Sequence, residues 1–196
     1  MLDRIAELRA AGLDVRAQVA ARGVGGIVGL RTTTNPFAFT PGWKEIADKP
    51  LAERLAQLHD PAFRARLLYE LTQPSDHPWA MALANCYGNL FRMSDPVDYE
   101  PHPDSSIAAE AKRAGREPAE YCYDVLLEQD GERLLYMPTV NYAHGSLDDV
   151  HTMMTTDFAL FGLSDGGAHC EGRGCGDGSL RYRRRWPSAR LYRRCL

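Results

Sequence analysis

A single carboxylate, Asp165, follows a short apolar run in the C-terminal third of the chain. The run, Phe158 to Leu163, is bounded by turn residues, which is typical of a strand buried on both faces. Gly166 and Gly167 come next and let the backbone turn sharply. Because α/β barrels and open α/β sheets keep their chemistry at the carboxyl ends of strands, this pattern indicates a catalytic or ligand-binding carboxylate. The alternative is a turn opened by an Asp-Gly dipeptide, which is common.

Other residues with ligand chemistry lie on both sides of this carboxylate. His169 and Cys170 follow it, and Cys175 comes five residues later, but that spacing matches no standard zinc site. His144 and His151 lie just before and on a predicted helix, where exposure or a hydrogen bond to a loop is commoner than ligation. A lone carboxylate cannot hold a catalytic zinc ion. We therefore expect no metal site built from these residues alone.

Length and composition limit the class of protein. The chain has 196 residues, 44% hydrophobic and 25% charged side chains and a net charge of -3, which is ordinary for a soluble globular protein of one or two domains. No run approaches about 18 apolar residues, and the N-terminus is charged where a signal peptide would be apolar. Five cysteines without a CxxC pair suit free thiols in a reducing compartment. The sequence therefore predicts a cytoplasmic protein with no membrane partner.

The pattern of apolar residues predicts alternating helices and strands. Helices are expected at residues 2–11, 51–58, 61–71, 106–114, 118–128 and 146–154. The last of them is opened by a capping box from Ser146 to Asp149. Strands are expected at residues 15–19, 134–140 and 158–163, and residues 79–90 are ambiguous between helix and strand. Because strands joined by helical crossovers pair in parallel, we expect an α/β barrel or a doubly wound sheet.

Two segments between these elements are candidates for ligand contact. Residues 23–29 are rich in glycine, but Val28 stands where a dinucleotide fingerprint needs glycine, and no Gly-Lys-Ser/Thr follows. A structural turn or a substrate-side loop is expected there instead. Residues 32–42 form a long irregular connection with two aromatics, Phe37 and Phe39, that we expect to be exposed, and such loops often line pockets.

The remaining basic and polar side chains are interpreted as surface. Arg54, Arg64 and Arg66 are expected to be solvated, on helices whose apolar stripes face the core. His59 and His77 are expected to be exposed, without a specialised role.

The composition changes at residue 171. Residues 171–196 contain eight arginines, two acids and no lysine, a net charge of +6, whereas residues 1–170 carry -9. Tyr182 and Trp186 lie among the arginines, so one interpretation is a nucleic-acid-binding arm, because arginine pairs with phosphate and aromatic rings stack on bases. The absence of any helical or strand period favours an aberrant or disordered tail, for example one produced by a reading-frame slip. We therefore expect a domain at 1–170 and a tail at 171–196.

The segment Gly162–Cys170 resembles the last-strand motif of metal-dependent amidohydrolases of the N-acyl-D-amino-acid deacylase (D-aminoacylase) type. Its sequence is Gly-Leu-Ser-Asp-Gly-Gly-Ala-His-Cys. Residues 15–30, 35–37, 51–55 and 141–145 are also similar to that family, in its order. The resemblance covers residues 1 to about 170. It implies a (β/α)8 TIM-like barrel with one or two zinc ions that hydrolyses C–N bonds, typically amides of acylated amino acids. It also implies that Asp165 is the catalytic aspartate.

The chain departs from that family in its metal ligands. The family uses a His-x-His pair after the first barrel strand and further ligands after middle strands, and no His-x-His occurs here. The expectation is therefore the C-terminal part of an incomplete barrel, inactive by itself, that acts on a small-molecule amide. In the whole enzyme, Asp165 would accept a proton from metal-activated water, return it to the leaving amine and contact the metal. The alternatives are a catalytically inactive α/β interaction module or nucleic-acid binding through the tail.

Overall fold

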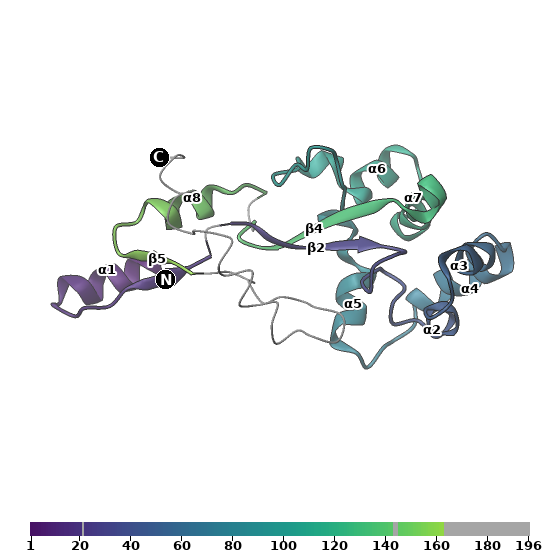
Figure 1. The fold of residues 1–196 in the computed structure, drawn as a ribbon, viewed down its shortest axis with the longest axis horizontal. Helices are drawn as coiled ribbons and strands as arrows, with labels where there is room; N and C mark the ends of the chain where they lie inside the picture. The colour runs from purple at the N-terminus through teal and green to yellow at the C-terminus, as the bar shows by residue number, and fades with distance from the viewer. Residues whose placement is uncertain (21, 143–144, 163–196) are drawn as a thin grey trace, which may run out of the picture. The chain divides into compact units, whose positions relative to one another are not determined.

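The computed structural model describes residues 1–20, 22–142 and 145–162 and defines a mixed α/β protein (Figure 1). The chain divides into two compact units. The central unit is Ala21–Asp157, and the terminal unit combines Met1–Ala20 with the segment that begins at Phe158. No helix in the described part of the chain is long and apolar enough to cross a membrane.

Several helices of the central unit begin at a proline that follows a capping residue. In α2 the Thr40 hydroxyl accepts a hydrogen bond from the Trp43 amide at 3.2 Å, and in α4 Asp60 accepts from the Ala62 amide at 3.2 Å. The helices of this unit are α2 (Pro41–Ile46), α3 (Leu51–Leu58), α4 (Pro61–Leu71), α5 (Pro78–Ala84), α6 (Ile107–Arg113), α7 (Pro118–Gly131) and α8 (Asp148–Thr155), with short 3-10 helices η1 (Cys86–Asn89) and η2 (Pro103–Ser105).

The predicted helices are confirmed, two of them with their bounds. α3 and α4 begin and end where the sequence pattern places them, and the ambiguous residues 79–90 resolve into α5 and η1. The expected capping box before α8 is wrong in its register. The Ser146 hydroxyl accepts from the amide of Asp148 at 3.3 Å, and the helix begins at that residue with no side-chain cap.

The sheet of the central unit is antiparallel. Strands β2 (Val24–Gly29), β4 (Leu134–Val140) and β3 (Phe91–Arg92) lie in the order β2-β4-β3, and β4 is hydrogen-bonded on both sides. Two predictions are wrong here: parallel pairing fails for this sheet, and residues 24–29 of the glycine-rich segment form a strand rather than a turn. Close packing requires a glycine at position 25, because a Cβ there would lie 2.5 Å from Cε2 of Tyr136.

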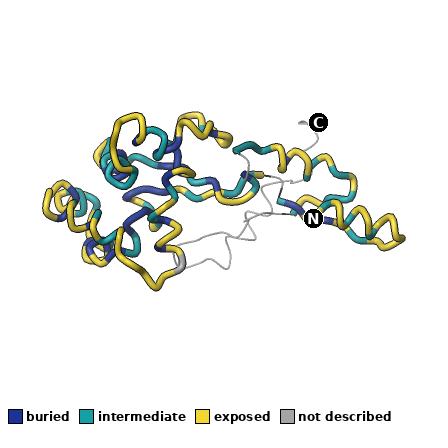
Figure 2. The backbone as a smooth tube through the Cα atoms, turned by 180° about the vertical axis from the view of Figure 1, so that it is seen from behind, coloured by how far each residue is buried: buried dark blue, intermediate teal, exposed yellow. Residues whose placement is uncertain are grey.

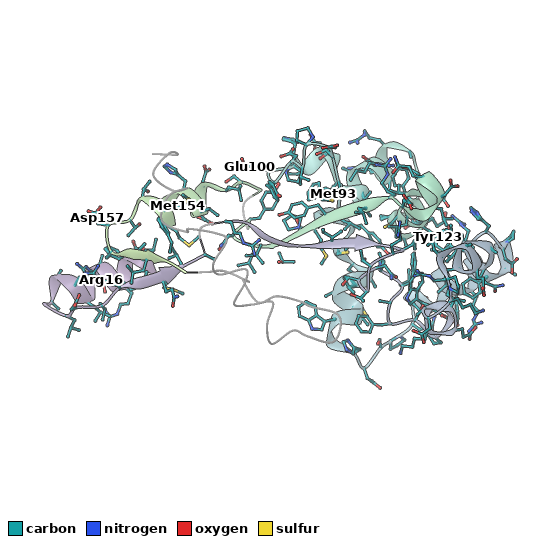
Figure 3. All side chains as sticks on the ribbon, in the orientation of Figure 1. Arg16, Met93, Glu100, Tyr123, Met154 and Asp157 are labelled. Atoms are coloured by element: carbon teal, nitrogen blue, oxygen red, sulfur yellow. The ribbon has the colours of Figure 1, made fainter. Side chains whose placement is uncertain are left out.

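The hydrophobic core of the central unit lies where this sheet meets the helices. Figure 2 shows buried residues concentrated there. Tyr123 of α7 (Figure 3) is 1% exposed, its hydroxyl donates to the Leu58 carbonyl at 2.7 Å, and the Phe37 ring packs edge-on against it at 5.3 Å. Phe37 was expected to be exposed and is 1% exposed, so that prediction is wrong. The irregular loop turns this ring inward because an aromatic side chain gains most by burial.

The terminal unit pairs strands from the two ends of the described chain. Helix α1 (Leu2–Ala10) leads to β1 (Ala17–Val19), which pairs in parallel with β5 (Ala159–Phe161), Gln18 opposite Leu160. A strand after Phe158 and its parallel pairing are therefore confirmed. Its expected burial on both faces is wrong, because Leu160 is 50% exposed and Phe161 is 44% exposed. Among the described residues β5 pairs with β1 alone, so its second edge has no strand to cover it.

The described strands form a two-stranded and a three-stranded sheet, and these residues contain no closed barrel. The coarse prediction of an α/β protein is thus correct, and the predicted (β/α)8 barrel is not confirmed. The expected tail at 171–196 lies outside the described residues.

Candidate functional site

The residues predicted to carry chemistry follow the carboxyl end of β5. Asp165, His169, Cys170 and Cys175 lie outside the described residues, as does His144. The described chain ends at Gly162, whose amide donates to the Val19 carbonyl at 2.9 Å and so continues the ladder with β1. Because the two strands are parallel, both carboxyl ends lie at one end of the pair. Asp165 follows Phe161, the last residue of β5, by four residues in sequence.

No group of three or more His, Cys, Asp or Glu side chains is arranged to hold a metal ion within residues 1–20, 22–142 and 145–162. His151 lies on α8 with its side chain exposed, and His59 is exposed at the end of α3. The described residues therefore do not fit the one or two zinc ions that the family resemblance implies.

His77 is exposed as expected, but it has a structural role that the sequence did not reveal. Its Nδ1 accepts a hydrogen bond from the Trp79 amide at 3.3 Å, which caps α5. Its ring also stacks on Phe39, with ring centroids 4.0 Å apart. The histidine thereby ties the loop of residues 32–42 to the start of α5.

A cavity of about 320 Å³ lies in the central unit between that loop and two helices. Its walls come from residues 36–41, from the end of α4 with the segment after it, and from α5. The irregular loop therefore lines a cavity, with Phe39 as a wall residue.

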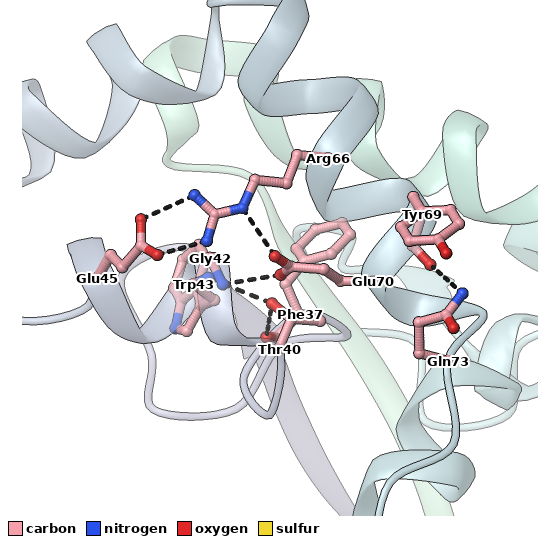
Figure 4. A network of polar contacts seen from close by, with 9 residues as sticks. All are labelled: Phe37, Thr40, Gly42, Trp43, Glu45, Arg66, Tyr69, Glu70 and Gln73. Carbon is pink, nitrogen blue, oxygen red and sulfur yellow. Dashed lines mark hydrogen bonds and ion pairs between the residues drawn. The ribbon is translucent and has the colours of Figure 1, made fainter.

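A network of polar contacts fixes the loop against α4 (Figure 4). Glu70 accepts from the Gly42 amide at 2.7 Å and from Arg66 Nε at 2.8 Å. The guanidinium of Arg66 also pairs with Glu45, and this ion pair holds the pKa of Glu45 below its ordinary value. Thr40 caps α2 in the same network. The side chain of Glu70 is only 13% exposed and accepts two hydrogen bonds, so these contacts hold this part of the cavity wall in place.

The three arginines expected to be solvated all have specific partners. Arg54 donates to the Leu30 carbonyl at 2.5 Å, Arg64 pairs with Asp124 at 3.3 Å, and Arg66 belongs to the network above. Arg66 is exposed, as expected, whereas Arg54 and Arg64 are half-buried because their long side chains fold back along the helix surfaces to reach these acceptors.

A second charged cluster joins β3 to α6 and α7. Arg92 donates to Glu110 at 2.9 Å and to Glu128 at 2.6 Å, and Arg133 donates to Glu128 at 3.2 Å. The hydrogen bond from Arg92 is the main cause that lowers the pKa of Glu128 from its ordinary value. These groups are satisfied by one another, so the cluster stabilises the fold and leaves no group for catalysis.

Two of the cysteines lie in the described residues, and both are free thiols as expected. Burial raises the pKa of Cys86 to about 11 and raises that of Cys122 further. Because the thiolate is the reactive form, neither side chain is suited to nucleophilic chemistry.

Sequence reasoning did not identify the cavity residues on α4 and α5, and it also missed helix α2, whose start lines the cavity. Thr40-Pro41 is the signal that could have found α2, because the same pairing of capping residue and proline marks the start of α4 at Asp60-Pro61. Compared with known proteins, the chain matches no protein-family model, no curated protein and no solved structure. The mixed α/β class therefore follows from the fold alone.

Proposed function

We propose that the chain is part of a metal-dependent amidohydrolase of the N-acyl-D-amino-acid deacylase type, which hydrolyses the C–N bond of a small-molecule amide. The observation that supports this most is the place of the motif. The Gly162–Cys170 segment, which resembles the family's last-strand motif, begins at the carboxyl end of a strand in parallel pairing with β1. That end of a parallel strand is where α/β enzymes carry their reactive groups.

In this proposal Asp165 is the general base and acid. Its carboxylate accepts a proton from the water that attacks the amide carbon, and it returns that proton to the nitrogen of the leaving amine. The family resemblance implies one or two zinc ions with Asp165 as a ligand, but the described residues supply no ligand set, so the proton transfers are the only steps assigned to this chain.

The coding sequence upstream of this chain gives the first test. A strand ending in His-x-His in a compatible frame would supply the metal ligands that the sequence lacks and would support the proposal. If that region encodes no such strand, the catalytically inactive α/β interaction module becomes the better interpretation.

The second test is Asp165→Asn in the chain produced together with that upstream segment. The substitution is isosteric, so we expect kcat for an N-acyl-D-amino acid to fall roughly 10²–10⁴-fold with little change in thermal midpoint. Asp157→Asn is the matched control, because Asp157 is exposed just before β5. Near-normal kcat with a large loss of stability would make Asp165 a turn-forming residue and would remove its catalytic role.

The charge of the tail favours a second candidate function. Residues 171–196 carry +6 with aromatic side chains among the arginines, a composition that suits single-stranded nucleic acid. Fluorescence anisotropy with a labelled single-stranded oligonucleotide tests this nucleic-acid-binding function. Binding that weakens steeply with salt and is lost when residues 171–196 are removed would support this function, and no binding at low salt would exclude it.

A further inference from the structure

The cavity beside the 32–42 loop has walls that are mostly apolar. Phe39 comes from the loop, Pro74 from the segment after α4, and Ala80, Met81 and Ala84 from α5. At about 320 Å³ the cavity is at the small end of the range for ligand pockets, large enough for one ring or a short branched chain. These walls favour a ligand with an apolar body.

Among the described residues, the charged side chains that line the cavity are both acidic, Glu70 and Asp76, and no Lys, Arg or His lines it. Glu70 already pairs with Arg66 at 2.8 Å, and the same guanidinium also pairs with Glu45. Asp76 is exposed and forms no hydrogen bond or ion pair with any other residue in the described part of the chain. Within the described part of the chain, Asp76 is therefore a cavity carboxylate without a counter-charge.

The carboxyl end of α4 has the same preference for a cation. Glu70 and Leu71 place the carboxyl end of α4 at the cavity, and the last turn of that helix has no basic residue to offset its partial negative charge. The amino end of α2 would attract an anion, but its first amides are already used. The Gly42 amide donates to Glu70 and the Trp43 amide donates to Thr40. An anion would find no open donor there.

We propose that this cavity is a binding site for a small organic cation with an apolar body, an alkyl- or arylammonium ion. The apolar part contacts Phe39, Pro74 and Met81, and the ammonium group pairs with the carboxylate of Asp76. This site lies within the central unit, and it does not depend on the proposed amidohydrolase function.

A titration of the full chain with 2-phenylethylammonium chloride tests the proposal. The readout is the NMR signal of the Met81 methyl group, assigned with Met81→Leu. We expect a saturable shift with a Kd of about 1 mM, as for a small fragment with few contacts. The comparator is 3-phenylpropionate, which has a similar body and the opposite charge, and which should give no saturable shift.

Two matched variants separate the charge from the shape of the cavity. Asp76→Asn keeps the shape and should weaken ammonium binding by about 1.5- to fivefold, the range for an exposed ion pair. Asp48→Asn removes an exposed carboxylate that does not line the cavity and should leave binding unchanged. Equal binding of the ammonium and the carboxylate, absence of a saturable shift with either, or an unchanged affinity in Asp76→Asn would each overturn the proposal.

Discussion

At the scale of single residues, Arg92 makes the clearest electrostatic contribution to the fold. It donates to Glu110 and Glu128, from α6 and α7, and is about one-third exposed. A carboxylate whose pKa is lowered in the folded state adds stability above its ordinary pKa and loses that contribution as the pH falls through its folded value. For Glu128 the ordinary value is 4.5, so the contribution is present at neutral pH and disappears below about pH 4.5.

We therefore expect Glu128→Gln to destabilise the protein at pH 7 by less than about 1 kcal/mol, because the side chain is 38% exposed and solvent screens the pair. The difference in unfolding free energy between the two proteins should shrink as the pH is lowered below 4.5. Urea unfolding at a series of pH values measures this. Asp48→Asn serves as the control, and a Glu128→Gln effect that stays constant as the pH falls well below 4.5 would contradict the assignment.

Predictions for single residues failed where the contacts of a side chain are determined by the tertiary structure. Phe37 lies in an irregular loop and shows no period, so nothing in the sequence places it against Tyr123. Arg54 and Arg64 sit on helix faces where solvation is the simplest expectation, yet each reaches an acceptor far away in sequence, at Leu30 and Asp124. Exposure of His77 could be predicted, whereas its stacking on Phe39 depends on the tertiary structure.

At the scale of secondary-structure elements, the glycines of β2 are not equivalent. A Cβ on Gly25 would lie 2.5 Å from the Tyr136 ring and 2.8 Å from the Met137 carbonyl oxygen. A Cβ on Gly26 would meet only the Met137 methyl group, at 3.7 Å, which is ordinary contact. The register between β2 and β4 also shifts between Val24 and Gly25, so the backbone is closely fitted there.

We expect Gly25→Ala to destabilise the protein by about 1–3 kcal/mol, because the added methyl must displace the ring or the backbone. Gly26→Ala should be neutral or slightly stabilising, since alanine lowers the entropy of the unfolded chain. Thermal or urea unfolding of both variants measures the difference. Similar stability of the two would show that the contact with Tyr136 does not restrict this position.

The elements that could be predicted are those with strong local signals. α4 has an N-cap, a proline and an apolar stripe, and β4 is a run of apolar residues between polar turns, so both were placed with their bounds. β2 was missed because glycine is a poor strand former, and because the close contact that requires glycine at position 25 is with β4, more than one hundred residues away in sequence. The antiparallel pairing was also missed, because the alternation of helices and strands along the sequence does not determine which strands pair.

At the scale of the whole molecule, the described parts of the two units differ in how many apolar side chains they bury. The hydrophobic core cluster among the described residues comes from the central unit, with Val28, Tyr123 and Leu126 almost fully buried. In the terminal unit α1 has no buried residue, and β1 and β5 are three residues long each. The sequence did not predict this division, because the terminal unit is assembled from segments at the two ends of the chain. The prediction of a domain at 1–170 and a separate tail stays untested.

This difference in burial predicts a difference in local stability. Elements with few buried apolar contacts open at low free energy, whereas core elements exchange their amide hydrogens only on global unfolding, which costs about 5–15 kcal/mol. Hydrogen exchange followed by mass spectrometry of the full chain should therefore show rapid exchange in α1 and β5 and strong protection in α7 and β4. Val28→Ala, which removes buried methyl groups from the core, should lower protection in α7 and β4 by an amount equivalent to about 1–3 kcal/mol and leave exchange in α1 unchanged. The variant distinguishes units that open independently from units that unfold together, which the wild-type exchange pattern alone does not distinguish. If α1 exchanges faster in Val28→Ala, or if both units are equally protected in the wild-type chain, then the two units unfold as one cooperative structure, and burial within each unit does not determine its stability.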